Sequence, residues 1–349
     1  MFEVYSKMLG RNFSLYENNR TLSFLGRVKN DAEWNTIPRK PSLNAKLIYL
    51  MIVPITVGSG FGNNTYATLA NIDLSSDREQ IRFTWFEMTS SEDPFYKAGP
   101  IPSPNSGQIT IDVYEIDGSE SGTYGLVLQN STDYLSITDA SRLGCCVWAY
   151  SGNIQSGFSI PSNLPGYESC IIFANWNDDG CVLSLDEEKR VRIYSSEFTW
   201  NPTVERTNYD LNIKIVAFSS GFTIPLTGFE AGLLIWNENG VLTFSSDYPP
   251  VKVAKFVDYS GTGSFLNRVI DLGGEGYMLP ITTSIGGLYR SYIQRERFAA
   301  VGLSMSGRNV TIRKSVELMD YNGHNTFSNP SILVPNYPFP ILQASDYFG

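Results

Sequence analysis

The residue that most often performs acid–base chemistry near neutral pH is scarce in this sequence, which contains a single histidine, His324. A Ser-His-Asp triad, a Cys-His dyad, a histidine-rich zinc site or a haem pocket would each depend on that one imidazole. His324 lies in the polar segment DYNGHN, which is typical of an exposed turn. The sequence therefore argues against histidine-based mechanisms.

Neighbouring carboxylates, at residues 178–179 and 186–188, are the natural candidates for glycosidase chemistry. That chemistry needs two carboxyl groups a few ångströms apart, in environments that separate their pKa values. Both groups lie in strings of turn residues, so we expect solvated side chains whose pKa values are not pushed apart. The sequence predicts no catalytic residue at Asp178 or Asp186, and therefore no enzyme.

Metal and cofactor sites are also not expected. The loop at residues 175–179 offers oxygen ligands but lacks the spacing of an EF-hand. The glycine-rich segments at residues 58–62 and 261–263 are not followed by a Walker lysine. The four cysteines lack paired Cys-x-x-Cys spacing, so we expect free buried thiols, with one disulfide or a metal site as alternatives. These cysteines are Cys145, Cys146, Cys170 and Cys181.

The charge balance limits the partners of the chain. Its 349 residues include 26 Lys and Arg against 35 Asp and Glu, a formal net charge of −9. Because phosphate neutralisation needs a surplus of basic residues, we expect no nucleic-acid partner. The strongly apolar run at residues 47–55 is shorter than the roughly 20 residues of a membrane helix, so we expect no membrane insertion. The N-terminal segment lacks the pattern of a secretory signal, which favours assembly in the cytoplasm.

Aromatic residues make up 13% of the chain, more than the cores of small domains need. Exposed tyrosine and tryptophan rings would suit sugar stacking or a protein interface, where such rings act as anchors. The alternative is ordinary core packing. The candidate interaction surface consists of Trp148, Trp176, Trp236, Tyr337 and Phe339.

Three similar segments, starting at Phe2, Thr123 and Glu230, organise the chain. One offset aligns Phe2 with Tyr124, and a second aligns Gly125 with Gly232. Each copy has an alternating apolar segment, a polar turn and a second alternating segment, the signature of a β-hairpin.

Similar strands follow each hairpin, and no segment has a long helical pattern. Apolar strands are expected at residues 47–53, 170–174 and 277–281, and alternating strands that close each unit begin at Ile109, Leu211 and Val310. The sequence predicts an all-β protein of three tandem β-sandwich-like modules, with a small barrel as the alternative for each. The modules span residues 1–122, 123–229 and 230–349.

The C-terminal segment, residues 329–342, carries four prolines among apolar residues. Proline lacks the N–H that a central strand needs, so we expect a short extended tail that cannot pair fully in a sheet. Such a tail would lie along a surface, and we favour a contact with another subunit.

The strings YGLVLQNSTDYLSITD and AGLLIWNENGVLTFSS resemble the opening segment of small tail proteins of tailed bacteriophages. Those proteins begin with an aromatic-Gly-Leu strand, an Asn/Asp/Gly turn and a second strand that ends in Ser or Asp. The first copy departs from this pattern, since Glu3 stands where the others have Gly125 and Gly232.

The resemblance implies a non-enzymatic component of the virion, at the tail tip, baseplate or fibre, that is assembled in the host cytoplasm. Its expected partners are other copies of itself, other tail proteins, and a glycan or protein receptor on the host surface. The alternative is a carbohydrate-active protein, either a lectin or a glycan hydrolase, that uses exposed aromatic rings and the turn carboxylates.

Overall fold

The computed structural model describes residues 3–6, 8–14, 22–43, 45–53, 55–60, 63–89, 95–98, 109–116, 125–129, 134–138, 144–195, 204–220, 222, 224, 233–236, 240, 242–259, 261–263, 268–282, 284–292, 295–321, 328–334 and 337–349. These residues form β-strands and two short 3-10 helices, η1 (Tyr167–Ser169) and η2 (Ala344–Asp346). The predicted all-β fold is confirmed, with several antiparallel sheets. In the described part of the chain, no helix has the length and apolar character needed to cross a membrane.

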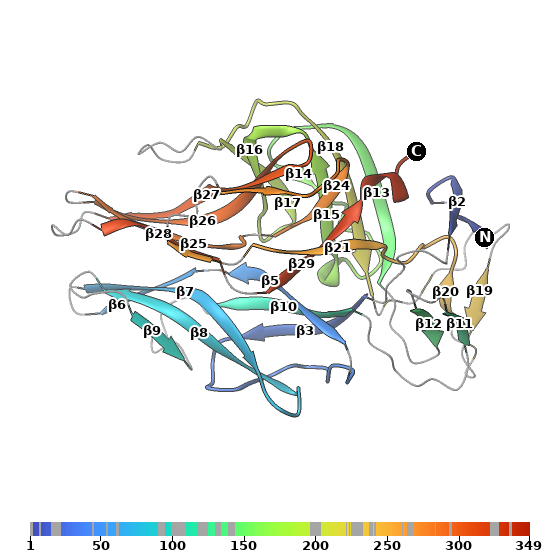
Figure 1. Cartoon of the computed structure of the whole chain (residues 1–349), viewed down its shortest axis with the longest axis horizontal. Helices are drawn as coiled ribbons and strands as arrows, with labels where there is room; N and C mark the ends of the chain where they lie inside the picture. Colours follow the sequence, from blue (N-terminus) through green and yellow to red (C-terminus); the bar gives the residue numbers. More distant parts are fainter. Residues whose placement is uncertain are drawn as a thin grey trace.

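Three separate two-stranded sheets form from the three similar segments. Each is antiparallel, so the predicted hairpins are confirmed. Their strands are β1 (Glu3–Ser6) with β2 (Arg11–Ser14), β11 (Gly125–Gln129) with β12 (Tyr134–Thr138), and β19 (Leu234–Trp236) with β20 (Leu242–Ser245). Figure 1 shows these hairpins together at one end of the molecule, away from the large sheets.

A three-stranded sheet follows the first hairpin, in the order β3-β10-β5. Its strands are β3 (Leu22–Lys29), β5 (Lys46–Val53) and β10 (Thr110–Ile116). Every residue of β10 is buried, because it is the middle strand and its faces are covered. In the sequence, this middle strand β10 comes after both of its neighbours, β3 and β5.

A six-stranded sheet has the order β13-β18-β15-β24-β29-β21. Its first half repeats the arrangement of β3, β10 and β5, with β18 between two earlier strands, and its second half does so with β29 in the middle. The strands are β13 (Cys145–Ile154), β15 (Ile171–Trp176), β18 (Leu211–Ser219), β21 (Val253–Asp258), β24 (Tyr277–Ile281) and β29 (Pro338–Gln343).

A nine-stranded sheet packs against the six-stranded one, since β15 contacts β26 and β16 contacts β24. Its main path is β14-β17-β16-β26-β25-β28-β22, with β27 and β23 branching from β26. The strands are β14 (Phe158–Ser159), β16 (Asp178–Leu185), β17 (Arg190–Ser195), β22 (Gly261–Gly263), β23 (Val269–Asp271), β25 (Gly286–Tyr292), β26 (Arg295–Ser306), β27 (Asn309–Tyr321) and β28 (Ser328–Val334).

A five-stranded sheet completes the first part of the chain, in the order β4-β8-β7-β6 with β9 also paired to β8. Its strands are β4 (Asn35–Thr36), β6 (Ile55–Gly60), β7 (Asn63–Leu74), β8 (Gln80–Thr89) and β9 (Phe95–Ala98). Leu69, Phe83 and Trp85 belong to the same core as Ile111 and Val113 of β10. This sheet and the β3-β10-β5 sheet thus share one apolar core.

The proposed module boundaries stay a prediction, but the sheets add two facts. Strand β15 pairs with β24, and β16 pairs with β26, so two sheets continue across residue 229. In the described residues, no strand of a sheet pairs across residue 122, and an isolated bridge links Met51 of β5 to Ser284 in the third unit. The second and third units are therefore joined by continuous sheets.

Two expectations for the C-terminal part are wrong. The strand expected from Val310 to close the third unit is β27, which pairs with β26 and β23 in the nine-stranded sheet. The closing place is taken by β29, which is extended, as predicted, but lies within a sheet rather than along a surface.

The proline positions explain how β29 is accommodated. Pro338 and Pro340 pair with β21, and only Leu342 and Gln343 pair with β24. Pro338 and Pro340 are two residues apart, so the positions where their backbone N–H groups would be lie on the same side of the strand. On that side β29 has no partner strand before Leu342. The prolines thus occupy the part of β29 that has a neighbour on one side only.

Candidate functional site

Three of the five predicted surface aromatics are buried, so their assignment to an interaction surface is wrong. Trp176 is 3% exposed, because β15 lies inside the six-stranded sheet and is covered by the nine-stranded one. Tyr337 and Phe339 are buried as well, and their ring centroids lie 5.4 Å apart. Tyr337 also packs edge-on against Tyr49 of β5, so these rings belong to the core.

Trp148 and Trp236 are accessible. Trp236 on β19 is 45% exposed. Trp148 is half-buried on β13, an edge strand, where its ring centroid lies 5.8 Å from Tyr150 and 6.3 Å from Phe158 of β14. Tyr150 and Phe158 are 4.9 Å apart, so the three rings form a cluster where the two large sheets share an edge. The sequence did not single out Phe158, because β13 and β14 belong to different sheets.

The carboxylates that were candidates for catalysis are hydrogen-bonded parts of the structure, and Asp178 begins strand β16 rather than lying in the expected turn. Asp178 accepts from the Gly180 N–H (2.8 Å), the Tyr209 hydroxyl and the Cys181 thiol (3.4 Å). Burial alone would raise the pKa of Asp178, but these hydrogen bonds outweigh burial and lower it. A carboxyl group with a lowered pKa is a poor general acid.

Asp186 is held in the same way. It accepts hydrogen bonds from the backbone N–H (2.9 Å) and the Nε (2.7 Å) of Arg190, and from the Nε of Arg192 (2.9 Å). Burial acts to raise the pKa of Asp186, and the hydrogen bonds from these arginines lower it overall. Arg192 continues to Glu205 at 3.1 Å, which makes a charged network along the turn. Neither carboxylate is in the solvated state that the sequence suggested.

The four cysteines are free and buried. Burial raises the pKa of Cys145 to about 12 and that of Cys170 to about 11, and it also raises the pKa of Cys146. Thiols in this state are poor nucleophiles, because the thiolate is the reactive form. In the described residues, no group of three His, Cys, Asp or Glu side chains is placed to hold a metal ion. His324 lies outside the described residues.

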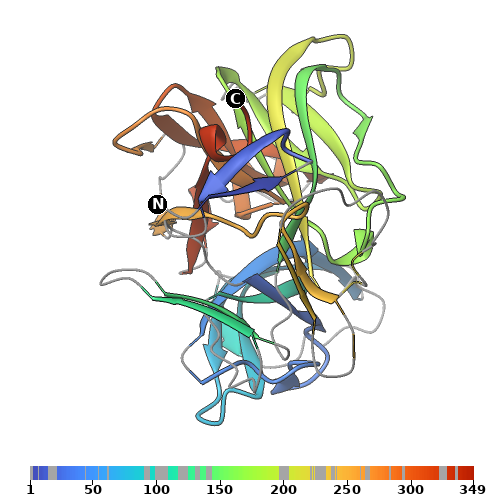
Figure 2. The same ribbon diagram turned by 90° about the vertical axis from the view of Figure 1, so that its right-hand side faces the viewer.

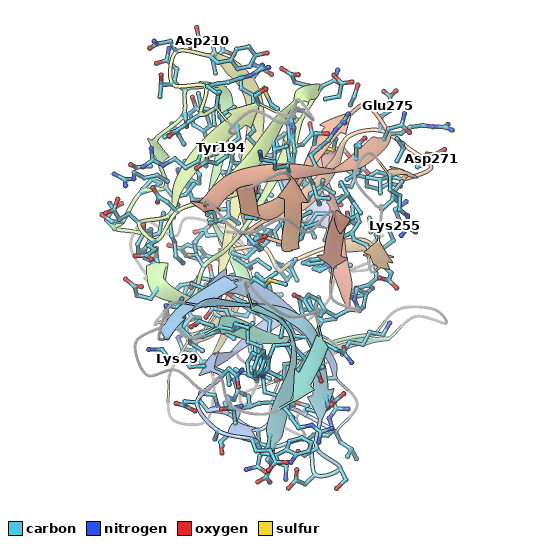
Figure 3. The ribbon with its side chains drawn as sticks, turned by 90° about the vertical axis from the view of Figure 1, so that its left-hand side faces the viewer. Lys29, Tyr194, Asp210, Lys255, Asp271 and Glu275 are labelled. Atoms are coloured by element: carbon cyan, nitrogen blue, oxygen red, sulfur yellow. The ribbon has the colours of Figure 1, made fainter. Side chains whose placement is uncertain are left out.

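A cleft of about 390 Å³ opens where the β3-β10-β5 sheet meets the two larger sheets. The chain contains three similar three-stranded units, β3-β10-β5, β13-β18-β15 and β24-β29-β21. Residues from all three line the cleft. Lys29 at the end of β3, labelled in Figure 3, is one of the lining residues, and the ends of β15 and β24 contribute Ile172 and Ile281. The cleft therefore has apolar walls and a charged rim.

An ion pair forms one side of the cleft. Arg27 on β3 donates from Nε to Oδ1 of Asp112 (2.7 Å) and from Nη2 to Oδ2 (3.0 Å). The two residues are register partners on β3 and β10, which is why both guanidinium donors can reach one carboxylate. The Asp112 side chain is 5% exposed and is neutralised by this bidentate contact.

The opposite side of the cleft is anchored by Lys189. Its Nζ donates to the carbonyl oxygens of Tyr167 (2.6 Å), Glu168 (3.1 Å) and Cys170 (3.2 Å). Burial lowers the pKa of Lys189. The three carbonyls fix the amino group and hold η1 against the β16–β17 turn, an arrangement suited to support rather than to nucleophilic attack.

The fold and the cleft together define an all-β protein in which the amino group of Lys189 links the β16–β17 turn to the segment that leads into β15 of the neighbouring sheet. The family described as "Family of unknown function (DUF6453)" matches residues 9–323, so the chain belongs to that family. Neither the curated proteins nor the solved structures contain a match to the chain.

Proposed function

We propose that this chain is a non-enzymatic structural protein of a bacteriophage tail, at the tail tip, baseplate or fibre. The observation that carries the proposal is the state of the three segments that resemble phage tail proteins. They are separate two-stranded sheets at one end of the molecule, where their edges can meet other chains. The chain works in the virion by binding other tail proteins and further copies of itself.

The chemistry of the described side chains supports binding rather than catalysis. Asp112, Asp178 and Asp186 are each occupied by hydrogen bonds to neighbouring strands or turns. Asp178 and Asp186 have lowered pKa values, whereas acid catalysis near neutral pH needs a raised one. The thiols have raised pKa values and are buried.

Mass spectrometry of purified particles of the phage that encodes this chain tests the proposal. We expect the chain in the particles at a fixed ratio to the other tail proteins. Its absence from particles, despite its synthesis in infected cells, would contradict a virion role. Release of reducing ends from host surface glycans by the purified protein would contradict a non-enzymatic role.

The cluster of Trp148, Tyr150 and Phe158 favours a second function, the binding of host glycans. Its rings are half-buried, and beside them the exposed Asn212 Nδ2 donates to Asn153 Oδ1 at 3.0 Å. Aromatic faces next to amide groups are typical of sugar-binding surfaces. Titration of host glycans into the protein should give binding that Trp148→Ala weakens and that Trp236→Ala, on a different sheet, leaves unchanged. Equal binding by both variants would exclude this cluster.

A further inference from the structure

The first and second units share a framework, so their outer sheet faces can be compared residue by residue. The offset that aligns the first two similar segments also aligns Lys29 with Ser151. Lys29 of β3 pairs with Thr110 of β10, and Ser151 of β13 pairs with Lys214 of β18. Each pair therefore contains one lysine at the same place on the face, although the lysine lies on a different strand in each unit.

The framework itself does not require this lysine. The offset that aligns the second and third similar segments aligns Ser151 with Asp258, and Asp258 pairs with Pro338. The third unit thus carries no basic residue at the corresponding pair. The lysines of the first two units therefore need an explanation outside the pairing of the strands, and the second unit supplies one.

In the second unit, an aromatic segment of the chain covers this face. Tyr347, which follows η2, packs edge-on against Phe218 of β18, with ring centroids 5.3 Å apart. Lys214 points to the same face as Phe218, and its Nζ lies 5.5 Å from the centre of the Phe348 ring, a cation–π contact. Figure 2 shows this C-terminal segment, in red, beside the green and yellow strands of the second unit. The lysine of the second unit thus holds an aromatic ring from outside the unit.

A second equivalence fixes the position along the strands. The offset that aligns Lys29 with Ser151 also aligns Phe24 with Cys146, and these two residues pair with Tyr114 of β10 and Phe218 of β18. Tyr114 is therefore the counterpart of Phe218. The Tyr114 hydroxyl donates to the Ser169 carbonyl oxygen of η1 at 3.0 Å, so η1 covers it as the segment after η2 covers Phe218.

In the first unit, the position that corresponds to Phe348 lies inside the cleft. Lys29 and Thr110 line the cleft beside Leu50 and Ile52 of β5. The Lys29 side chain is exposed and forms no ion pair with another described residue. At about 390 Å³, the cleft has room for an aromatic side chain and the backbone that carries it.

We infer that the cleft binds an aromatic side chain from a short segment of a partner protein, in the place that Phe348 takes in the second unit. Leu50, Ile52 and Ile281 supply the apolar surface for the ring. The Lys29 ammonium at the rim is its cation–π partner, as Lys214 is for Phe348. The inference goes beyond the role in the tail, since it holds for any protein that supplies the ring.

Photo-cross-linking with a synthetic peptide tests the inference on the full chain. The peptide ASDYFG has the sequence of residues 344–349, which covers the second unit, and it carries benzoylphenylalanine in place of Phe348. We expect adducts, located by mass spectrometry, on Leu50, Ile52 or Ile281 in the cleft. An excess of unmodified ASDYFG should suppress them, whereas the same peptide with Phe348→Ala should not.

Variants of the chain test the roles of the lysine and of the cleft. Lys29→Met should lower the adduct yield about two- to five-fold at a subsaturating peptide concentration, which is the effect of losing one cation–π contact at an exposed site. Lys40→Met removes the same charge from an exposed lysine outside the cleft and should leave the yield unchanged. Ile52→Trp should abolish the adducts by filling the cleft, and an unchanged circular dichroism spectrum shows that this variant is folded.

Three results would overturn the inference. Adducts confined to Phe218 or Lys214 would show that the peptide only replaces the chain's own segment on the second unit. A lack of adducts in the cleft, or equal yields from Lys29→Met and Lys40→Met, would show that no ring binds there beside Lys29. These results leave the role in the tail unaffected, and absence of the chain from particles leaves the cleft unaffected, so the two proposals fail separately.

Discussion

The turns β7–β8 and β16–β17 use one device in two settings. Arg78 and Lys189 are the two non-glycine residues with positive φ among the described residues, at 62° and 54°. Each donates its N–H to the carbonyl three residues earlier, on Ser75 at 2.9 Å and on Asp186 at 3.0 Å. The Arg78 side chain reaches the backbone just before β5, and the Lys189 side chain reaches the backbone just before β15. In both cases the strand belongs to a neighbouring sheet.

The two turns differ in how much of the structure depends on them. Arg78 donates from Nη2 to one carbonyl, that of Ala45, at 2.6 Å. Lys189 donates to three carbonyls and lies at the cleft where the sheets meet. The same type of turn should therefore contribute differently to the free energy of unfolding in its two settings. Mutations of Arg78 and Lys189 can measure that difference.

Lys189→Met should have the largest effect. It removes the amino group but retains an unbranched side chain, and it leaves three carbonyls without this donor. We expect the free energy of unfolding to fall by about 2–3 kcal/mol, as for hydrogen bonds to a charged group. Urea denaturation followed by tryptophan fluorescence measures the loss. A loss no greater than that of Arg78→Met would refute the difference between the turns.

Asp186→Asn should come next, with a dependence on pH. The pKa of Asp186 is lowered from its ordinary value of 3.8, so its stabilising contribution is present above that value and is lost as the pH falls through the folded-state pKa. We expect a loss of about 1–2 kcal/mol at pH 7 that shrinks below pH 4. Denaturation curves at a series of pH values show this, and a difference independent of pH would contradict it.

Arg78→Met should cost about 1 kcal/mol, the usual contribution of a single hydrogen bond. The same urea measurement applies, and Arg78→Lys provides the matched control because it keeps a donor at this position. A rescue by lysine would show that the bond to Ala45, rather than the packing of the side chain, is responsible.

Asp77→Asn should have the smallest effect. Hydrogen bonds from the Ser75 hydroxyl (2.5 Å) and the Glu79 N–H (3.1 Å) lower the pKa of Asp77, but its carboxylate is fully exposed. Solvent screens such a group, so the melting temperature should change less than in Asp186→Asn. A larger change would mean that exposure does not explain the difference between the two turns.

Local patterns in the sequence predicted the elements that form from neighbouring residues. The three hairpins depend on a turn and two adjacent alternating segments, all of which are visible in the sequence. The turn at residues 186–188 was also predicted, but the lowered pKa of Asp186 was missed, because it depends on hydrogen bonds from Arg190 and Arg192, which the paired strand β17 brings to the carboxylate.

Elements that depend on distant pairing were not predictable. The segments at Val310 and Pro338 both contain apolar residues at strand spacing, and only the sheet partners decide which one lies between β21 and β24. The burial of Trp176 depends similarly on the sheet that covers β15. One-sided alternation identifies a surface strand, but it gives no signal for a strand covered on both faces.

The strand order has a consequence for how the protein is made. In each three-stranded unit the middle strand, β10, β18 or β29, is synthesised after both of its neighbours. The two earlier strands emerge from the ribosome with no hydrogen-bond partner between them, and they stay open until many more residues have followed. Such long-range closure slows folding and leaves apolar edges exposed to aggregation during translation. A slower rate of translation would therefore lengthen the period in which each unfinished sheet depends on protection by chaperones.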